Sequence, residues 1–243
     1  MAKLQLRLAH LYPKMLNIYG DYGNVLVLKK RCEWRDIDII IDEYEIGDAL
    51  EEHDIYFIGG GQDTQQVAVS KDIQRHKTFL ENEKRMGAVF LSICGGYQLL
   101  GEYYEQQNGE KLLGIGLLDA YTKAGSKRFI GNVTSECKFL DKSKSLVGFE
   151  NHSGLTYLRG DTKPIAEVLI GNGNNGRDKG EGARSQNVFG TYLHGSFLPK
   201  NPHFADYLIK LALKKKYGME IELSLLDDTL EMFAHSSVVK KPY

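Results

Sequence analysis

Short apolar runs alternate with longer amphipathic stretches along the first 105 residues. The apolar runs are rich in β-branched side chains, which is typical of buried strands, whereas the amphipathic stretches have helical periodicity. Strands are predicted at 4–11, 37–41, 54–58 and 88–93, and helices at 25–35, where Asn24 is the expected cap, at 70–85 and at 96–104. Strands that alternate with helices in this way form parallel sheets covered by helices. The first half therefore predicts an α/β fold with a mainly parallel central sheet flanked by helices.

The apolar runs of the second half are separated by turns rich in Gly and Asn. Strands are predicted at 128–135, 146–150, 166–170 and 188–192, and an amphipathic helix at 202–216. Strands joined by short turns usually pair antiparallel, so we expect them to extend the same sheet in a more antiparallel manner. Because no Pro- or Ser-rich linker is present, residues 1–217 are predicted to form one domain. No structure is predicted for the tail at 218–243, whose suggested role is docking of a partner.

The composition is that of an ordinary globular protein, with 42% hydrophobic and 26% charged residues. The 243 residues carry 31 Lys and Arg against 32 Asp and Glu, which argues against binding of nucleic acid or anionic membranes through bulk charge. No apolar run approaches the roughly 18 residues of a membrane span, and the first residues lack a signal-peptide pattern. A cytoplasmic location is therefore expected. Cys32, Cys94 and Cys137 form no CxxC pair, so neither a disulfide framework nor a metal site is predicted.

The strongest local signal surrounds Cys94. A predicted buried strand ends at this residue, Gly95 and Gly96 permit a sharp turn, and a predicted helix begins at once. This order is typical of a nucleophile elbow, which exposes a reactive side chain at the carboxyl end of a strand. The N–H groups and partial positive charge at the start of the helix favour a thiolate. A buried structural cysteine is the alternative, and the local pattern alone leaves both open.

A thiolate nucleophile needs a group that protonates the leaving group, and histidine is the usual choice because its pKa lies near neutrality. Of the seven histidines, His194 follows a predicted strand and precedes Gly195. Open α/β sheets carry their sites at the carboxyl ends of strands. The pattern therefore favours His194 as the catalytic histidine, with His152 as the competing candidate.

Two glycine-rich segments could bind an anion through the backbone. Gly59-Gly60-Gly61 follows a predicted strand and can present N–H groups to a developing oxyanion, although a tight turn is the simpler interpretation. It is not a P-loop, because no Gly-Lys-Ser/Thr sequence follows. Residues 171–176 match G-x-G-x-x-G, but no helix-forming sequence follows them. They are predicted to form a flexible surface loop rather than a dinucleotide site.

Arg128 lies where a turn around Gly125 meets a predicted strand. Its planar guanidinium suits bidentate binding of a carboxylate. From its position alone, however, a solvated surface charge is the preferred interpretation.

Four motifs occur together in a characteristic order. They are Ile-Gly-Gly-Gly-Gln-Asp at 58–63, Ile-Cys-Gly-Gly-Tyr-Gln at 93–98, Gly-Phe-Glu-Asn-His at 148–152 and Gly-Thr-Tyr-Leu-His-Gly at 190–195. In this order they resemble class I glutamine amidotransferase domains of the cobyric acid synthase (CobB/CobQ) type, and more closely the glutaminase subunits of lipid II isoglutaminyl synthase. Residues 16–24 and 198–201 extend the resemblance, which covers most of residues 1–215. It implies the three-layer fold of class I glutamine amidotransferases.

The resemblance also implies roles for individual residues. Cys94 falls on the family's nucleophile and His194 on its catalytic histidine. Arg128 falls on the arginine expected to hold the glutamine, which overturns its interpretation as a surface charge. The backbone N–H of Gly60 or Gly61, together with that of Gly95, would form the oxyanion hole.

One position departs from the wider class. Many class I glutaminases place Glu two residues after the catalytic histidine to orient it, but this chain has Ser196 there. The cobyric acid synthase branch lacks that Glu, which agrees with the resemblance. A Cys-His dyad and a carboxylate supplied by a partner subunit would both fit, so the group that orients His194 is left open. His152 would then be a structural or substrate-proximal residue.

The implied reaction is hydrolysis of L-glutamine to glutamate and ammonia through a thioester on Cys94. Ammonia would pass to a Mur-ligase-like (MurT-like) synthase subunit, which amidates the α-carboxyl of D-glutamate in the lipid II stem peptide during peptidoglycan synthesis. ATP and Mg²⁺ are expected on that partner, and no cofactor is expected in this chain. A glutaminase for another synthase, such as a cobyrinate amidase, and a non-catalytic binding module of the same fold remain alternatives.

Overall fold

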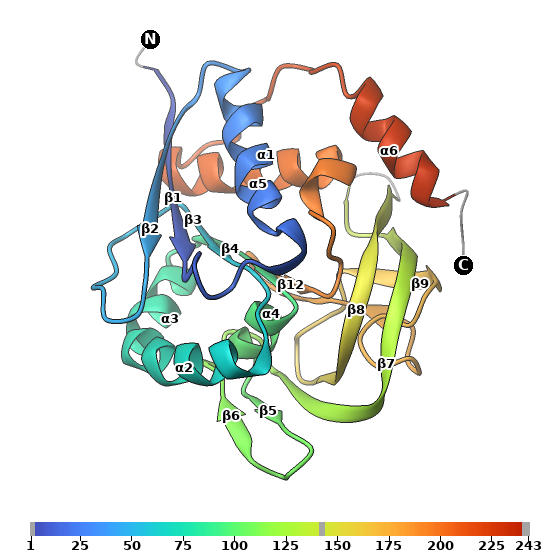
Figure 1. Ribbon diagram of the computed structural model, residues 1–243. Helices are drawn as coiled ribbons and strands as arrows, with labels where there is room; N and C mark the ends of the chain where they lie inside the picture. Colours follow the sequence, from blue (N-terminus) through green and yellow to red (C-terminus); the bar gives the residue numbers. More distant parts are fainter. Residues whose placement is uncertain (1–2, 141–143, 240–243) are drawn as a thin grey trace.

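The computed structural model describes residues 3–140 and 144–239, which form two sheets with helices on both faces of the first (Figure 1). The strands of the first sheet are β1 (Gln5–Leu11), β2 (Asp38–Tyr44), β3 (Ile55–Ile58), β4 (Val89–Ile93), β11 (Ala183–Ser185) and β12 (Val188–Thr191). Their order is β11-β12-β4-β3-β1-β2, and every neighbouring pair is parallel except β11 and β12. The predicted α/β fold with a mainly parallel central sheet is confirmed.

Helices cover both faces of this sheet, as the alternating pattern predicts. One face carries α1 (Tyr22–Glu33) and α5 (Pro202–Tyr217), and the other carries α2 (Asp63–Ile73), α3 (Lys77–Arg85) and α4 (Gly95–Leu100) (Figure 1). Short 3-10 helices lie at η1 (Ile18–Gly20), η2 (Gln74–His76) and η3 (Leu198–Lys200). Gly218 ends α5 with φ +70°, a left-handed conformation that glycine adopts without strain.

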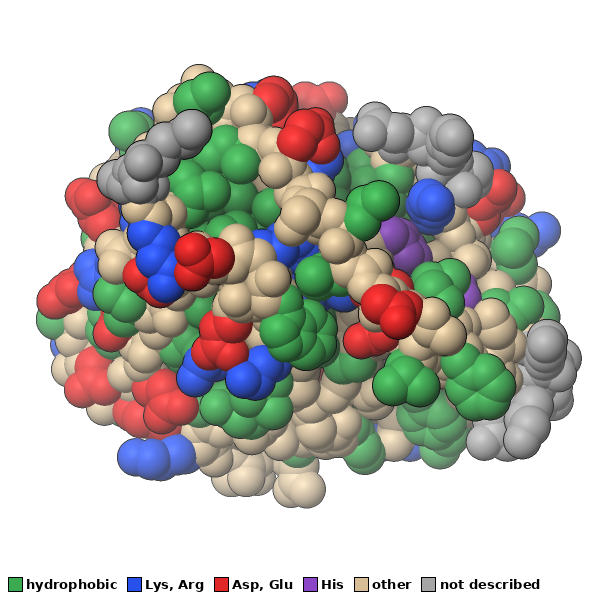
Figure 2. Space-filling view, turned by 90° about the horizontal axis from the view of Figure 1, so that it is seen from above, with side chains coloured by type: hydrophobic (Ala, Val, Ile, Leu, Met, Phe, Trp, Pro, Cys, Tyr) green, Lys and Arg blue, Asp and Glu red, His purple; other side chains and the backbone are tan. Residues whose placement is uncertain are grey.

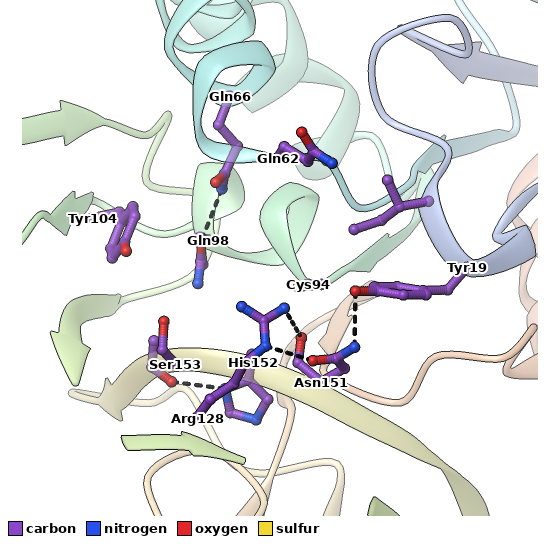
Figure 3. Close-up of a pocket in the computed structure, with 13 residues that line it drawn as sticks. Tyr19, Gln62, Gln66, Cys94, Gln98, Tyr104, Arg128, Asn151, His152 and Ser153 are labelled. Carbon is purple, nitrogen blue, oxygen red and sulfur yellow. Dashed lines mark hydrogen bonds between the residues drawn. The ribbon is translucent and has the colours of Figure 1, made fainter. Parts of the chain in front are cut away.

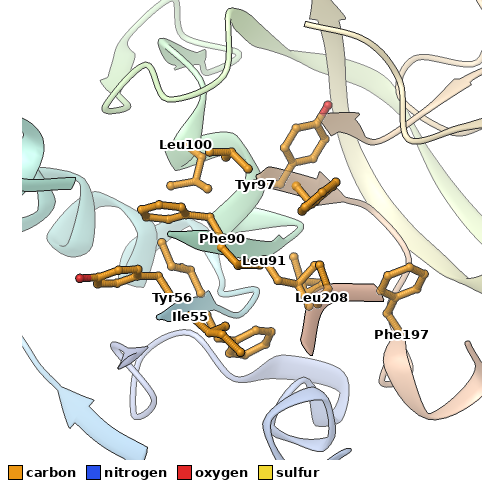
Figure 4. Close-up of a cluster of buried hydrophobic side chains, with 14 of the residues drawn as sticks. Ile55, Tyr56, Phe90, Leu91, Tyr97, Leu100, Phe197 and Leu208 are labelled. Atoms are coloured by element: carbon orange, nitrogen blue, oxygen red, sulfur yellow. The ribbon is translucent and has the colours of Figure 1, made fainter. Parts of the chain in front are cut away.

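The core lies between the central strands and these helices. Figure 4 shows Tyr56 and Phe90 of β3 and β4 packed near Tyr97 and Leu100 of α4, with Leu208 of α5 on the opposite side. The strands β3 and β4 are buried along their whole length. A strand covered on both faces has no polar side to alternate with, which explains why these segments have continuous apolar sequences.

Several predicted helix boundaries are wrong. The helix α1 begins at Tyr22, so Asn24 lies inside it instead of capping it, and its side chain accepts the N–H of Leu198. The single helix predicted at 70–85 is two helices, because α2 starts directly after the glycine segment and η2 separates it from α3. The helix predicted at 96–104 ends at Leu100, and the residues that follow form a strand.

The second half forms a sheet of its own. Its strands are β5 (Tyr103–Glu105), β6 (Lys111–Leu113), β7 (Ala120–Cys137), β8 (Lys144–Leu158), β9 (Ala166–Ile170) and β10 (Gly180–Glu181). Antiparallel pairing is confirmed for the strands predicted at 128–135, 146–150 and 166–170, whereas β5 pairs with β7 in parallel. The prediction that they extend the first sheet is wrong for these three strands, but the strand predicted at 188–192 is β12, which does extend it, parallel to β4. The segments 128–135 and 146–150 are parts of two much longer strands, which satisfy each other's hydrogen bonds along β7 and β8. Of the later strands that the structure describes, β11 and β12 return to the first sheet.

The loop predicted to lie at the surface, 171–176, does so only at its ends: Gly171 and Gly176 are exposed, but its middle is buried. Gly173, Asn174 and Asn175 are buried, and the buried Glu150 carboxylate accepts the backbone N–H groups of Asn172 and Gly173. Asn and Gly serve here to turn the chain inside the protein.

The tail is structured over much of its length, which the sequence analysis does not predict. A helix, α6 (Thr229–Val239), lies beside η3, where both ring nitrogens of His235 are bonded, to Lys200 O and to Ser145 Oγ, each at 2.7 Å. Residues 240–243 of the predicted tail lie outside the described residues. Figure 2 shows hydrophobic side chains among charged ones on the face formed by α1, α5 and α6. Within the described ranges, no helix has the length and apolar character needed to cross a membrane.

Candidate active site

Four neighbouring strands of the first sheet end at one edge. The loop after β12 carries His194, the turn after β4 carries Cys94, the turn after β3 carries 59–61, and the loop after β1 leads to Asp21. The strands β12, β4, β3 and β1 are parallel neighbours in register, so these loops meet. Ligands of open α/β sheets bind at this carboxyl edge.

The backbone at Cys94 is strained, with φ 48° and ψ −104°. A positive φ is uncommon for a residue with a side chain, and such strain is found at functional sites where the surroundings enforce it. Here the next turn packs tightly on β3: Gly96 donates to Gly59 O at 3.2 Å, and a Cβ at Gly96 would lie 2.7 Å from the same oxygen. Only glycine permits this approach. The geometry is that of the nucleophile elbow predicted from the sequence.

His194 is fixed beside Cys94 by its backbone and its ring. Its main chain exchanges two hydrogen bonds with Phe149 of β8, and its side chain is fully buried. Nδ1 lies 3.4 Å from Oδ1 of Asp21, whereas Nε2 makes no hydrogen bond of normal geometry with the described residues. Burial by itself lowers the pKa of His194, but the negative charge available at Cys94 and the contact with Asp21 outweigh it and raise that pKa. A protonated imidazole at His194 is therefore favoured.

Asp21 is a candidate site residue that the sequence analysis missed. Its carboxylate is fully buried, and one oxygen faces His194 while the other accepts the N–H of Gly60 at 2.8 Å. Ser196, at the position of the absent Glu, donates through Oγ to Gly20 O at 2.5 Å and so holds the loop that carries Asp21. The available signal was the position of Asp21 after β1, whose carboxyl end lies at the same sheet edge.

Two backbone N–H groups remain for an oxyanion. The Gly60 N–H is already bonded to Asp21. No hydrogen bond within the described part of the chain uses the Gly61 N–H, and the Gly95 N–H lies in the first turn of α4, where intrahelical acceptors are lacking. Of the predicted oxyanion-hole residues, Gly61 and Gly95 have available donors and Gly60 does not.

A cavity of about 540 Å³ opens beside Cys94 (Figure 3). Its walls are mostly polar, and it is lined by Ile18, Tyr19, Gly61, Gln62, Gln66, Cys94, Gln98, Tyr104, Arg128, Asn151, His152, Ser153 and Gly154. On the α2 side, Gln66 Nε2 donates to Gln98 Oε1 at 2.7 Å, and Gln98 Nε2 donates to the Tyr192 hydroxyl at 3.1 Å. The volume and the convergent polar groups suit a small polar ligand.

Arg128 faces this cavity from the second sheet. It lies inside β7, where the register with β8 shifts between Ala124 and Phe129, and not at a turn that meets a strand. Such an irregularity re-aims side chains. Although Arg128 is exposed, its guanidinium lines the cavity and is bonded to Asn151.

His152 packs as a structural residue. Its ring stacks on Tyr192 with centroids 3.6 Å apart, and Nδ1 is bonded to Gly154 O at 2.8 Å. Burial lowers the pKa of His152 to about 3, so the ring is neutral.

The other two cysteines are buried away from the cavity: burial raises the pKa of the thiols of Cys32 and Cys137. Among the residues that the structure describes, no three His, Cys, Asp or Glu side chains are grouped to hold a metal ion.

A strained cysteine beside a buried histidine at the carboxyl edge of a parallel sheet is the arrangement of a nucleophile with its acid–base partner. Over residues 7–202 the sequence matches the family described as the CobB/CobQ-like glutamine amidotransferase domain. The chain belongs to this family, which confirms the resemblance seen in its motifs.

Two relatives match along nearly their whole length. The subunit GatD of the glutamine-hydrolysing lipid II isoglutaminyl synthase of Streptococcus pneumoniae is 42% identical over 93% of this chain and 87% of its own. The GatD subunit of Staphylococcus aureus is 38% identical over 98% of this chain and 96% of its own. A probable cobyric acid synthase of Methanococcus maripaludis is 34% identical, but the match covers only 62% of this chain and 30% of that protein.

Solved structures share the fold. A structure titled as PurLQS from Thermotoga maritima matches with a TM-score of 0.55 at 15% identity, over 89% of this chain and 96% of the other. Another, titled as a glutamine amidotransferase, has a TM-score of 0.56 at 14% identity, over 84% and 98%. The predicted glutamine amidotransferase fold is confirmed.

Proposed function

We propose that this protein is the glutaminase subunit of a lipid II isoglutaminyl synthase, which hydrolyses L-glutamine and passes the ammonia to a synthase subunit. The observation that carries the proposal is the strained Cys94 elbow beside the Asp21–His194 pair, on a cavity whose opposite wall holds Arg128. The similarity to the two GatD subunits over almost the full length of all three chains supports it.

In the first chemical step, the Cys94 thiolate attacks the side-chain amide carbon of L-glutamine. The carbonyl oxygen becomes an oxyanion, which the N–H groups of Gly61 and Gly95 stabilise by about 3 kcal/mol per donor. The imidazolium of His194 gives its proton to the amide nitrogen, the C–N bond breaks and ammonia leaves. A thioester on Cys94 remains.

In the second step, water hydrolyses the thioester. Neutral His194 takes a proton from the water, whose oxygen bonds to the thioester carbon, and the C–S bond breaks. The Cys94 thiolate and the imidazolium form again, and the new γ-carboxyl group of the product loses its proton to solvent to give glutamate. Asp21 keeps Nδ1 protonated and the ring oriented in both steps, as the acid of a catalytic triad does.

Arg128 binds the α-carboxylate of the substrate. A guanidinium at the far wall places the amide of the bound glutamine toward Cys94, and a bidentate pair with a carboxylate gives both affinity and orientation.

The partner in this proposal is a Mur-ligase-like, MurT-like subunit that amidates the α-carboxyl of D-glutamate in the lipid II stem peptide. ATP and Mg²⁺ would bind to that subunit, and this chain would need no cofactor. The assignment of 218–243 to partner docking and the cytoplasmic location stay predictions.

The proposal is tested by the intact mass of the chain after incubation with the glutamine analogue diazo-oxo-norleucine. A single adduct is expected, absent in Cys94→Ala and slower to form in Arg128→Ala. Cys32→Ala and Cys137→Ala are the matched controls and should still be labelled. If the chain alone is not labelled, the experiment is repeated with a MurT-like subunit present, and no adduct even then would refute the glutaminase and favour a non-catalytic binding module.

A cobyrinate amidase is the weaker alternative, because the cobyric acid synthase of Methanococcus maripaludis is matched over only 30% of its length. Reconstitution with a MurT-like subunit, ATP, Mg²⁺ and glutamine should amidate lipid II. Amidation of cobyrinate but not of lipid II would instead favour a cobyrinate amidase.

A further inference from the structure

One edge of the Arg128 guanidinium is hydrogen-bonded to Asn151, as Figure 3 shows. Nε donates to Asn151 Oδ1 at 2.6 Å, and Nη2 lies 3.5 Å from the main-chain oxygen of the same residue. The other edge, formed by Nη1 and the second N–H of Nη2, makes no hydrogen bond with any residue that the structure describes. Because a guanidinium can bind a carboxylate through either edge, this contact selects the edge that is left for a ligand.

The other end of the Asn151 amide is also engaged. Nδ2 donates to the Tyr19 hydroxyl at 2.8 Å, and the Tyr19 ring stands edge-on to His194 with centroids 5.0 Å apart. Tyr19 adopts φ 54°, an uncommon conformation for a residue with a side chain, so the surrounding contacts hold it there. Asn151 therefore joins the arginine on one wall of the cavity to the ring that lies against the catalytic histidine.

We propose that Asn151 is a positioning residue for glutamine: it aims the free edge of Arg128 at the substrate α-carboxylate and holds Tyr19 beside His194. The inference rests on the proposed glutaminase function. A neutral amide suits both contacts, because it accepts from the guanidinium and donates to the tyrosine hydroxyl. A carboxylate at this position would pair with the arginine and oppose the charge of the substrate.

The test compares two reagents that alkylate Cys94. Diazo-oxo-norleucine carries the α-amino and α-carboxylate groups of glutamine, whereas iodoacetamide carries neither. In Asn151→Ala, the labelling rate with diazo-oxo-norleucine should fall about tenfold or more, the effect of losing a hydrogen bond to a charged group. The rate with iodoacetamide should change less than about twofold, because this reagent has no carboxylate for Arg128 to bind.

Further variants sharpen the assignment. Asn151→Asp should also lose diazo-oxo-norleucine labelling, and Tyr19→Phe should lose less than Asn151→Ala because Arg128 keeps its partner. In an Arg128→Ala background, Asn151→Ala should add little, since the two act through one contact. Asn82→Ala is the matched control: it also removes an Asn–Arg hydrogen bond, to Arg85 on α3, outside the cavity.

Equal loss with both reagents in Asn151→Ala, or an unchanged rate with diazo-oxo-norleucine, would overturn the proposal. Thermal unfolding of each variant identifies any that fails to fold, and Asn151→Asp, which is nearly isosteric, then carries the test. Failure of the parent chain to react with diazo-oxo-norleucine, even with a partner subunit, would instead refute the glutaminase function, so the two failures are distinct.

Discussion

Ser196 and Asp21 lie at the place where many class I glutaminases have a Glu that orients the catalytic histidine: Ser196 occupies its position in the sequence, and Asp21 faces the ring. Ser196 has no carboxylate to offer the ring of His194, and its hydroxyl donates to the Gly20 carbonyl. The loop held in this way brings the Asp21 carboxylate to Nδ1 of His194 from 173 positions away in the sequence. A carboxylate in position to orient His194 is therefore present in this chain.

Asp21→Asn should lower glutamine turnover roughly 100-fold, within the range of general acid–base contributions. The amide oxygen can still accept the Gly60 N–H, so the turn at 59–61 should be kept. Because the carboxylate raises the pKa of His194, its removal should lower that pKa, and the loss of activity as pH rises should begin at lower pH. The measurement is the pH profile of kcat/KM in the active preparation.

The control for this variant is Asp161→Asn, an exposed carboxylate in a turn. Turnover that stays at the parental level in Asp21→Asn, with the same pH profile, would show that His194 needs no carboxylate in this chain and would favour a Cys-His dyad.

Helix α4 shows how one element carries the nucleophile. It has six residues, all buried, and begins directly after Cys94, so its position on β3 fixes the position of the thiol. Helix α4 packs on the end of β3 through the close approach of Gly96 to Gly59 and Ile58. The glycines of the Cys-Gly-Gly motif therefore serve packing between elements as well as the turn.

Gly96→Ala should displace α4 from β3 and cost about 1–3 kcal/mol of stability, as overpacking does. Labelling of Cys94 by diazo-oxo-norleucine should fall by an order of magnitude or more, because the thiol and the Gly95 N–H move with the helix. Urea unfolding and the labelling rate check the two effects.

Gly109→Ala, in a turn where a Cβ meets no neighbour within 4 Å, is the comparison; its positive φ can reduce stability, but labelling should be unaffected. A Gly96→Ala protein that labels at the parental rate would mean that the elbow does not depend on this contact.

The sequence predicts the presence of helices and strands better than the residues at which they begin and end. The continuous apolar runs of β3 and β4 are recognisable because both faces are buried. The helix α2 was missed at its start because its apolar positions are few and a glycine turn precedes it. Residue 128 was taken as the start of a strand because Gly125 and Ser126 resemble a turn, whereas β7 continues through them with an irregular register.

Glu181 joins the two sheets inside the molecule. It belongs to β10 of the second sheet and is fully buried. Its carboxylate accepts hydrogen bonds from the Thr191 hydroxyl at 2.6 Å and from the Tyr192 N–H at 3.0 Å, at the end of β12 in the first sheet. Its other oxygen has no hydrogen-bond partner among the described residues. Burial raises the pKa of Glu181 to about 7.

This pKa predicts a pH-dependent stability. Between about pH 4.5 and 7 the folded protein keeps a proton on Glu181 that the unfolded chain releases, so this residue lowers the free energy of unfolding as pH rises through that window. Glu181→Gln removes the titration and keeps an oxygen that can accept both hydrogen bonds. Relative to the parent, the variant should gain roughly 3 kcal/mol of stability between pH 4 and pH 8.

Urea unfolding across this pH range measures the difference. The exposed Glu110→Gln should give a flat difference from the parent. A flat difference for Glu181→Gln as well would mean that Glu181 keeps an ordinary pKa in the folded protein.

The sequence by itself determined the features that depend on neighbours along the chain. Strand and helix periodicity predicted the parallel first half, and the motif at 93–98 predicted the elbow, because a turn between a buried strand and a helix needs those glycines. The family followed from the order of four such motifs.

Tertiary structure decided what depends on contacts between distant segments. The pairing of Asp21 with His194, the engagement of the Gly60 N–H, and the Asn151 contact that aims Arg128 each join residues from different loops or strands. The second sheet is separate because β7 and β8 pair with each other along their length. No local pattern encodes such contacts. Each forms only when the chain has folded and brought distant segments together, where buried polar groups must find hydrogen-bond partners.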